Sequence, residues 1–433
     1  MSSMMALLVL VAILFVLLAS GLEIAFALGL TGIFGLVVWQ GGFNALSAVG
    51  EITWDVCTNF TLMSIPLFVL MSSILIESGI SNGLYRAVAI WIRRVPGGLA
   101  VASEIACAIF AAVSGSSVAT AAAIGRIAIP EMLDRGYQRR LTSGCIAAGG
   151  TLGLMIPPST GFIIYGSLME TSIGQLFIAG IIPGLFLASA FILTIFVWAK
   201  LRPGAAPKPP QATWGEKFKS LSRVWTMLLL MALIMGGIWG GIFTPVEAGG
   251  IGAFGALIIG LIRRGMSWKK FVDSLLDTAK MSGMIFVLLI GVMMFNYFFI
   301  MTRVPEALAN GIVSLSIPPV AIVIVMMICW LIGGCFLDTF GLMMLTLPVF
   351  IPIAKELGID LIWFGILHVI CIEAGAISPP VGVNVFMIAG MAKHIPMYTI
   401  FKGIVPFLIA MLIVLGVLIA APDIVTFLPN LMR

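Results

Sequence analysis

Residues 149–159, with the sequence GGTLGLMIPPS, and residues 373–382, with the sequence EAGAISPPVG, are two versions of one pattern. Each version places a Pro-Pro pair and several glycines inside an apolar stretch. Each also follows a second interrupted apolar stretch, SGSSVAT at 114–120 and GGCFLDT at 333–339. Corresponding positions in the two copies are 219 to 222 residues apart, about half of the 433-residue chain. The sequence therefore predicts an internal repeat with two interrupted membrane segments in each half, a pattern typical of a transporter's binding site.

The composition is that of a membrane protein. Hydrophobic residues make up 61% of the chain and charged residues 9%, whereas about a quarter of a soluble domain is charged. Apolar runs near the ~20 residues that cross a hydrocarbon core lie at 4–20, 24–39, 61–77, 174–199, 225–243, 247–262, 282–301 and 397–421. The sequence predicts an all-α polytopic membrane protein embedded in a lipid bilayer, with no nucleic-acid partner.

Charge is distributed unevenly around these runs. A Pro-rich basic linker at residues 200–223 divides the chain into a first half, 1–199, and a second half, 224–433. Because loops rich in Lys and Arg stay in the cytoplasm, the linker is predicted to be cytoplasmic. Alternating the spans from that point places most other basic residues inside, most acidic loop residues outside, and both termini in the periplasm.

Each half is predicted to contain one re-entrant helical hairpin and one broken transmembrane helix. In the first half the hairpin covers 98–133 and the broken helix 141–170. In the second half the hairpin covers 319–354 and the broken helix 361–392. The charges that flank the hairpins make them enter from opposite sides, so the halves form an inverted repeat. Irregular backbone at membrane depth is tolerated only against protein or a wet cavity, and we therefore expect the four breaks to meet.

Two amphipathic stretches, residues 43–59 and 267–280, occupy matching positions between spans of the two halves. An amphipathic helix can lie in the membrane interface with its apolar face down. Each stretch is therefore predicted to lie along the interface as an arm that braces the scaffold.

The breaks supply the candidate binding groups. A helix that stops at mid-membrane leaves free carbonyls at its end and free amides at the next helix start. Carbonyl ends with Ser and Thr hydroxyls suit a small hard cation such as Na⁺, and amide ends suit an anion. The Na⁺ candidates are Ser114, Gly115, Ser116, Thr120, Gly150, Thr151, Pro157, Gly334, Asp338, Thr339, Gly375, Ser378 and Pro379. The substrate candidates are Ser117, Ser159, Thr160, Asn384 and Arg126. The alternative is that these small residues only permit close helix packing.

Ionisable residues at membrane depth are costly and often functional. Asp338 either binds a cation or caps the returning half-helix. Glu373 either takes a proton or cation or accepts a hydrogen bond from nearby backbone. Glu104 and Arg126 are predicted to form an ion pair within the first hairpin, and Arg126 is the only basic group expected near the site. His368 is either a proton relay or, the favoured interpretation, a hydrogen-bonded core histidine.

Four motifs occur in a fixed order along the chain: SGSSVATAAAIG at 114–125, GTLGLMIPPS at 150–159, GGIFTPVEA at 240–248 and ISPPVGVN at 377–384. Together they closely resemble the large membrane subunit of tripartite ATP-independent periplasmic (TRAP) transporters, the DctM type. The resemblance implies a Na⁺-coupled importer of organic acids in the bacterial inner membrane, with an elevator mechanism and no organic cofactor. It also implies two partners, a small four-helix membrane subunit of DctQ type and a periplasmic substrate-binding protein of DctP type.

The expected function is secondary active uptake by a protein that is not an enzyme, since the chain has no Gly-x-x-x-x-Gly-Lys-Ser/Thr sequence for ATP binding. A C4-dicarboxylate, sialic acid or another carboxylate is the expected substrate. One alternative is a stand-alone ion-coupled carboxylate carrier or antiporter of related fold. A second is an intramembrane serine hydrolase, which would need Ser116 or Ser117 within hydrogen-bond reach of His368.

Overall fold

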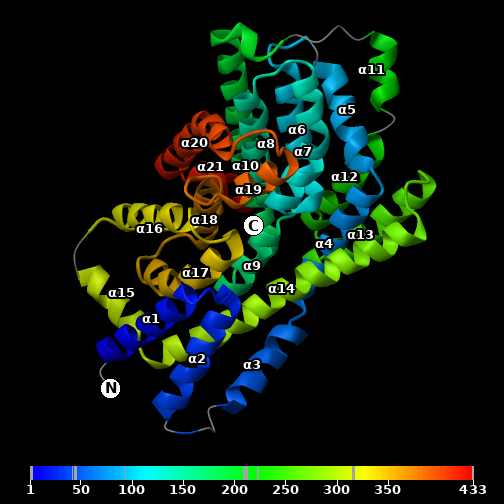
Figure 1. Cartoon of the computed structure of the whole chain (residues 1–433). Helices are drawn as coiled ribbons and strands as arrows, with labels where there is room; N and C mark the ends of the chain where they lie inside the picture. Colours follow the sequence, from blue (N-terminus) through cyan, green and yellow to red (C-terminus); the bar gives the residue numbers. More distant parts are fainter. Residues whose placement is uncertain are drawn as a thin grey trace.

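The computed structural model describes residues 3–40, 42, 46–92, 94–207, 213–221, 224–314 and 317–431. Residues 43–45 of the first amphipathic stretch and residues 208–212 and 222–223 of the linker lie outside this description. The described residues form helices joined by short loops, with no strand among them (Figure 1).

The helices of the first half and the linker are α1 (Ser3–Ala19), α2 (Ile24–Gln40), α3 (Ser47–Thr58), η2 (Thr61–Met63), α4 (Ser64–Glu77), α5 (Ile80–Ile92), α6 (Gly98–Ser114), α7 (Ser117–Asp134), α8 (Arg139–Met155), α9 (Thr160–Met169), α10 (Ile173–Leu201), η3 (Pro203–Ala205) and α11 (Trp214–Leu221). Those of the second half are α12 (Trp225–Trp239), α13 (Pro245–Ile262), α14 (Trp268–Met301), α15 (Val304–Ser314), α16 (Pro319–Gly334), α17 (Thr339–Glu356), α18 (Leu361–Ala376), α19 (Val383–Met391), α20 (Met397–Ala420) and α21 (Asp423–Asn430). Each half thus contains a helical hairpin, α6–α7 or α16–α17, and a broken helix, α8–α9 or α18–α19.

Several of these helices are long and apolar enough to cross a membrane. Among the described residues, α10, α13, α14, α17 and α20 each meet that condition alone. The segments α8 and α9 meet it together, with a bend of 42° at the break between them. The helices α6, α16 and α18 are apolar but shorter. The chain is therefore a polytopic helical protein in which both hairpins and broken helices interrupt the usual spans.

The two halves pack on each other according to the repeat. The helix α2 packs on α14, and in the matching position of the other half α13 packs on α4 (Figure 1). In the same way α8 packs on α20, and α10 packs on α18. We call the set α2, α4, α13 and α14 the scaffold, and the two hairpins, the two broken helices, α10 and α20 the hairpin body. Each part contains elements of both halves.

Glycines permit the closest crossings in both parts. A Cβ added to Gly291 of α14 would overlap the carbonyl oxygen of Ala25 in α2. A Cβ added to Gly403 of α20 would overlap the carbonyl oxygen of Arg140 in α8. Small residues at membrane helix interfaces let backbones approach in this way. These contacts join the first half to the second within the scaffold and within the hairpin body.

The two amphipathic stretches differ in structure. In the first half α3 ends at Thr58, and the chain bends by 55° into the next helix. In the second half residues 268–280 are the first part of α14, one continuous helix of 34 residues. Pro66 stands near the start of α4, whereas α14 contains no proline to interrupt its hydrogen bonds. The second stretch is therefore the first part of a long helix, and its place along the membrane interface stays a prediction.

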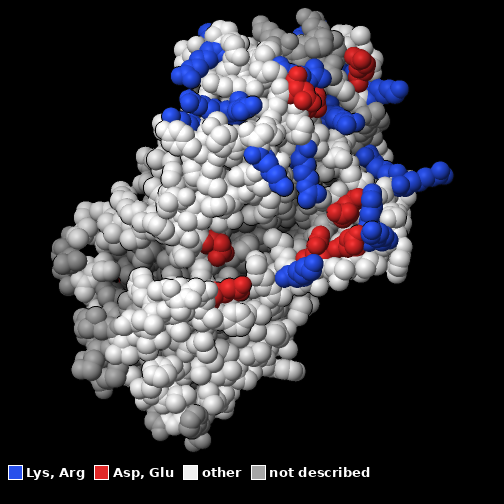
Figure 2. Space-filling view, viewed as in Figure 1, with Lys and Arg blue, Asp and Glu red and all other residues white. Residues whose placement is uncertain are grey.

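Lys and Arg gather at one end of the molecule. Figure 2 shows them over the upper part of the view, where Figure 1 places α5, α6, α7 and α11. Among the residues that are not grey, those at the lower left of the same view are almost all uncharged, and acidic residues border a hollow across the middle. The helix α11, which belongs to the predicted linker, lies at this end with the other basic residues, as one common face requires.

Candidate functional site

The tip of the first hairpin is a tight turn held by its own hydroxyls. Gly115, between α6 and α7, has a φ of +61°, a conformation that glycine adopts without steric cost. Ser116 caps α7, because its side chain accepts a hydrogen bond from the amide of Ala119. The hydroxyls of Ser114 and Thr120 lie 2.6 Å apart, and the Thr120 hydroxyl donates to the Ser116 carbonyl at 2.8 Å. The tip therefore presents a cluster of buried neutral oxygens.

This tip is bound to the break of the first broken helix. The amide and the hydroxyl of Thr160 both donate to the Gly115 carbonyl, at 3.1 and 2.7 Å. Ser159 caps α9 by accepting from the amide of Phe162, and its hydroxyl donates to the carbonyl of Leu154. The expected convergence of hairpin tip and helix break is thus present in the first half.

The second hairpin meets its helix break in the same manner. The amide of Val381 donates to the Cys335 carbonyl at 3.1 Å. Gly334 and Gly375 touch through their backbones, since a Cβ on Gly375 would lie 2.6 Å from the Gly334 Cα. Asp338 caps α17 by accepting from the amides of residues 340 and 341 at 3.1 and 3.0 Å. The predicted helix cap is thus confirmed, and the predicted cation role of Asp338 stays a prediction.

Glu373 connects the two hairpins. The hydroxyl of Thr339, at the second tip, donates to the Glu373 carboxyl at 3.2 Å, and Ser117 of the first hairpin lies close enough to interact with the same group. The hydrogen-bond partner of Glu373 is therefore a hairpin-tip side chain of its own half rather than neighbouring backbone. Its second oxygen, Oε2, is buried and has no hydrogen-bond partner among the described residues.

The four half-helices that begin at the breaks are not equivalent. Ser116, Ser159 and Asp338 cap α7, α9 and α17 with their side chains. The fourth, α19, begins after Gly382 and has no side-chain cap. Asn384, in its first turn, is 1% exposed, and its amide has no hydrogen-bond partner within the described part of the chain. The start of α19 is thus the uncapped positive helix end of the site.

A cavity of about 750 Å³ lies between the hairpin tips and the scaffold. The hairpin body contributes residues 116–118, 154, 338–340 and 383, and the scaffold side contributes residues 22–26 at the start of α2 and residues 281, 283, 284, 287 and 288 of α14. We call this space the central cavity. The scaffold wall, including the exposed Glu23, was not predicted from the sequence, because no local motif marks a helix face that becomes important only through tertiary contact.

The other predicted residues lie near the breaks and make mostly local contacts. The hydroxyls of Thr151 and Ser378 donate to backbone carbonyls of their own helices, at 2.6 and 2.7 Å. Gly150 packs against the first hairpin, where a Cβ would lie 2.8 Å from the Ala121 side chain. Pro157 and Pro379 each precede a second proline through a cis peptide bond.

The predicted ion pair between Glu104 and Arg126 is wrong. Glu104 is fully buried beside Gly149 of α8, and neither carboxyl oxygen has a hydrogen-bond partner in the described ranges. Arg126 is exposed on α7 and lies two residues from the buried positions 124 and 128, about 200° around the helix. It lines a surface groove together with Arg86, away from the tips. Equal depth on two helices does not make side chains face each other.

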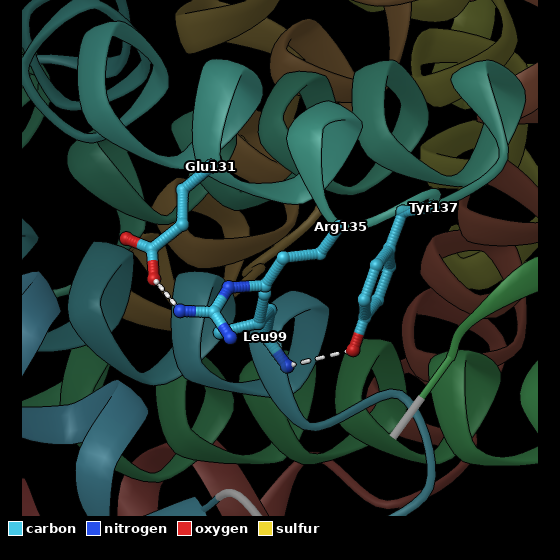
Figure 3. Close-up of polar contacts among 4 residues, drawn as sticks. All are labelled: Leu99, Glu131, Arg135 and Tyr137. Carbon is cyan, nitrogen blue, oxygen red and sulfur yellow. Dashed lines mark hydrogen bonds and ion pairs between the residues drawn. The ribbon is translucent and has the colours of Figure 1, made fainter. Parts of the chain in front are cut away.

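The base of the first hairpin has its own polar contacts (Figure 3). Arg135 pairs with Glu131 one turn earlier at 3.3 Å, and the amide of Leu99 donates to the Tyr137 hydroxyl at 3.2 Å. Tyr137 lies in the loop between α7 and α8, and burial raises the pKa of its phenol. These contacts fix the loop that leads from the hairpin into α8.

His368 is a core residue. Its ring lies between those of Trp330 and Tyr165, with centroid distances of 4.3 and 5.9 Å. Neither ring nitrogen has a hydrogen-bond partner among the described residues, so it is not hydrogen-bonded to Ser116 or Ser117. The expectation of a hydrogen-bonded histidine is therefore wrong, and the nucleophile and base of a serine hydrolase are not paired.

Several known proteins are similar to this chain in sequence or in fold. The model of the DctM component of tripartite ATP-independent periplasmic transporters matches residues 11–424. The chain is 33% identical to the C4-dicarboxylate TRAP transporter large permease protein DctM of Vibrio cholerae over 98% of each sequence. It is 29% identical to the sialic acid TRAP transporter large permease protein SiaM of the same species over 96% of each. The YdaH transporter of Alcanivorax borkumensis has a similar fold, with a TM-score of 0.65, 16% identity and 86% coverage of each chain.

Proposed function

Because this chain belongs to the DctM component family of tripartite ATP-independent periplasmic transporters, we propose that it is the membrane permease of a Na⁺-coupled importer of organic acids. The family consists of transporter permeases, and its members include large permeases for C4-dicarboxylates and for sialic acid. A carboxylate is the feature that these two substrates share. The carboxylate of an organic acid is accordingly the group that we expect this chain to recognise.

The uncapped start of α19 is the observation that carries the substrate assignment. Unpaired amides and the helix dipole at a helix start favour a negative group. Val383, at that start, lines the central cavity, and the buried Asn384 side chain offers an unused amide donor. We propose that the substrate's carboxylate binds here and that Ser117 of the first hairpin also contacts it. The proposed site uses no arginine.

The residues around the tips also fit Na⁺. The candidate groups are all oxygens, as a small hard cation requires: the hydroxyls of Ser114 and Thr120 at the first tip and of Thr339 at the second. Near the second tip, the buried Oε2 of Glu373 lacks a hydrogen-bond partner within the described residues. A cation bound there would offset the free-energy cost of burying this oxygen. We propose one Na⁺ site at each tip.

The position of the central cavity supports an elevator mechanism. One wall belongs to the hairpin body, and the other belongs to α2 and α14 of the scaffold. Movement of the hairpin body along the scaffold would carry the cavity from one membrane face to the other while the tips stay against their helix breaks. Each stroke would be an ordinary hinge or sliding motion of packed helices.

The proposed assembly has three components in the bacterial inner membrane. A small four-helix membrane subunit of DctQ type would support the scaffold, and a periplasmic binding protein of DctP type would deliver the organic acid. In this arrangement the basic end in Figure 2 faces the cytoplasm, and both termini are periplasmic.

The test is uptake by proteoliposomes that contain all three components. We expect a Na⁺ gradient directed inward to drive accumulation of C4-dicarboxylate or sialic acid, and we expect replacement of Na⁺ by K⁺ to abolish it. Omission of the binding protein is the matched control and should also prevent uptake. Uptake that persists without Na⁺ would contradict the coupling, and uptake by this chain alone would favour a stand-alone carrier.

A further inference from the structure

Three cationic side chains surround a surface cavity of about 470 Å³ in the hairpin body. Arg140 lies at the start of α8, Arg202 directly follows α10, and Lys402 lies near the start of α20. The described residues that line this cavity include no acidic side chain. We call it the cationic cavity; it is separate from the central cavity and shares no lining residue with it.

Helix packing forces two of these cations together. Gly403 contacts the backbone of Arg140 so closely that a Cβ would overlap the Arg140 carbonyl oxygen. Lys402 is the neighbour of Gly403, and Lys402 and Arg140 line the same cavity. The Lys402 ammonium lies 4.2 Å from the ring centroid of Tyr398. In the described part of the chain no carboxylate pairs with Arg140, Arg202 or Lys402. Like charges held together repel, and an anion between them would relieve the repulsion.

An apolar stripe leads away from the cationic cavity along α10. Leu193, Val197 and Leu201 line the same cavity and are 62%, 45% and 75% exposed. Their spacing of four residues places them on one face of the helix, over about 12 Å. Because α10 is apolar and long enough to cross a membrane, this face is suited to an acyl chain. A free anion would use only the cations, whereas a phospholipid would use both features.

A second basic cavity shows that arginines alone do not make such a site. It is lined by Arg86, Arg126 and Arg135, but also by Glu131 and Asp134. Glu131 neutralises Arg135 directly at 3.3 Å (Figure 3). Charge is therefore largely balanced within this groove, and it lacks the exposed apolar stripe of α10.

We propose that the cationic cavity binds an anionic phospholipid, with the phosphate between Arg140, Arg202 and Lys402 and an acyl chain along Leu193, Val197 and Leu201. Basic pockets between membrane helices commonly receive such headgroups. The ligand would link the start of α8, the end of α10 and the start of α20, which are three elements of the hairpin body. The proposal does not depend on the transported substrate or on Na⁺.

Native mass spectrometry of the purified full chain in detergent tests the proposal, with dioleoyl phosphatidylglycerol and dioleoyl phosphatidylcholine as probes. We expect tighter binding of phosphatidylglycerol. Each cation removed should weaken it about fivefold, so that Arg140→Gln with Lys402→Gln weakens it about 25-fold. The matched control is Arg86→Gln with Arg126→Gln, which removes two charges from the balanced groove and should leave binding unchanged.

Two further variants separate lost binding from lost folding. Arg140→Lys keeps the charge and should retain phosphatidylglycerol, and Arg202→Gln alters only an exposed residue after α10 and should weaken binding about fivefold. Equal retention of both lipids by the unaltered chain, or an equal loss in the control pair, would overturn the proposal. Displacement of phosphatidylglycerol by millimolar inorganic phosphate would overturn it in favour of a free anion.

Discussion

The two helix breaks share one geometry but differ in how they are closed. In the first half Pro157 is buried, and Thr160 donates two hydrogen bonds to the hairpin tip. In the second half Pro379 is exposed, and Val381 donates a single backbone bond. The first joint is therefore buried and tied at the break itself, whereas the second is exposed at its proline pair and combines one backbone bond there with the Thr339–Glu373 bond before the break. The repeat has preserved the joint but neither the burial of its proline pair nor the residues that supply its hydrogen bonds.

The breaks also differ in charge. The first is surrounded by neutral hydroxyls and carbonyls, while the second has Asp338 at the hairpin tip and Glu373 before the helix break. Asp338 uses its carboxylate as a cap, and Glu373 keeps one buried oxygen without a partner among the described residues. We therefore expect the two proposed cation sites to be chemically unequal, with the second one more sensitive to the loss of a charge.

The largest effect should come from the glycines on which both joints depend. Gly153 and Gly375 occupy equivalent positions, and a Cβ would overlap the Ser116 carbonyl in the first case and press on Gly334 in the second. We expect Gly153→Ala and Gly375→Ala each to lower stability by about 3 kcal/mol in thermal unfolding. Gly416→Ala is the control, because a Cβ there meets nothing within 4 Å. Tolerance of alanine at either joint would contradict the shared geometry.

A charge at the uncapped start of α19 should have the next largest effect. Asn384→Asp would place a carboxylate where the substrate's carboxylate is proposed to bind. We expect the apparent affinity for the organic acid in the uptake assay to fall about 30-fold, which is about 2 kcal/mol. The first half offers the control Ser172→Asp, since aspartate also caps a helix and the exposed Ser172 already caps α10. Similar losses in both variants would remove the distinction between the two helix starts.

Removal of the charge of Glu373 should affect Na⁺ more than folding. Glu373→Gln keeps an oxygen that can accept from Thr339 but removes the negative charge. We expect the Na⁺ concentration for half-maximal uptake to rise about tenfold, which is about 1.4 kcal/mol. Glu306→Gln, on an exposed face of α15, is the control. An unchanged Na⁺ requirement would make Glu373 a structural residue and the two halves more alike.

Removal of the Thr160 side-chain hydrogen bond in the first half should have a smaller effect on stability. Thr160→Val keeps the shape of the side chain but loses its bond to the Gly115 carbonyl, so we expect a loss of about 1 kcal/mol in thermal unfolding. Val381→Thr at the second break is the comparison, and we expect it to change stability little, because the backbone bond of residue 381 to Cys335 is kept and Val381 has no side-chain hydrogen bond to lose. A Thr160→Val variant as stable as the unaltered chain would mean that this side-chain bond does not distinguish the two joints.

The smallest effect is expected at Asp338. Asparagine caps helices about as well as aspartate, so Asp338→Asn should change the unfolding free energy by only about 0.3 kcal/mol. It should also leave the Na⁺ requirement of uptake unchanged, whereas a cation ligand would lose affinity. The uptake curve of this variant therefore separates a cap from a ligand, and a raised Na⁺ requirement would contradict the cap.

The sequence predicts the breaks well because they depend on local chemistry. Glycine at 115 permits the left-handed turn, and Ser116 and Ser159 begin the next helices as caps. The GGIFTPVEA motif likewise contains a local device, a capping box in which Thr244 and Glu247 bond to each other's amides at the start of α13. Such signals need only neighbours in the chain, and the structure places helix ends at them.

Long-range contacts were harder to predict. The supposed partners Glu104 and Arg126 point to different faces of the hairpin, because spacing from the tip does not determine which way a side chain faces. The contact between Thr339 and Glu373 and the wall supplied by α2 and α14 depend on how separate helices pack. The predicted ligand roles of the tip residues remain predictions that only binding and transport measurements can test.

The most direct test of the central claim, one cation site at each break, is the energetic coupling of uptake. The accumulation ratio of the organic acid is measured at steady state in three-component proteoliposomes, with the membrane potential held at zero and the Na⁺ ratio varied. We predict that the logarithm of the first ratio rises at least twice as steeply as the logarithm of the second, because two sites must fill before each stroke. Equal slopes would show a single coupling ion and contradict the account.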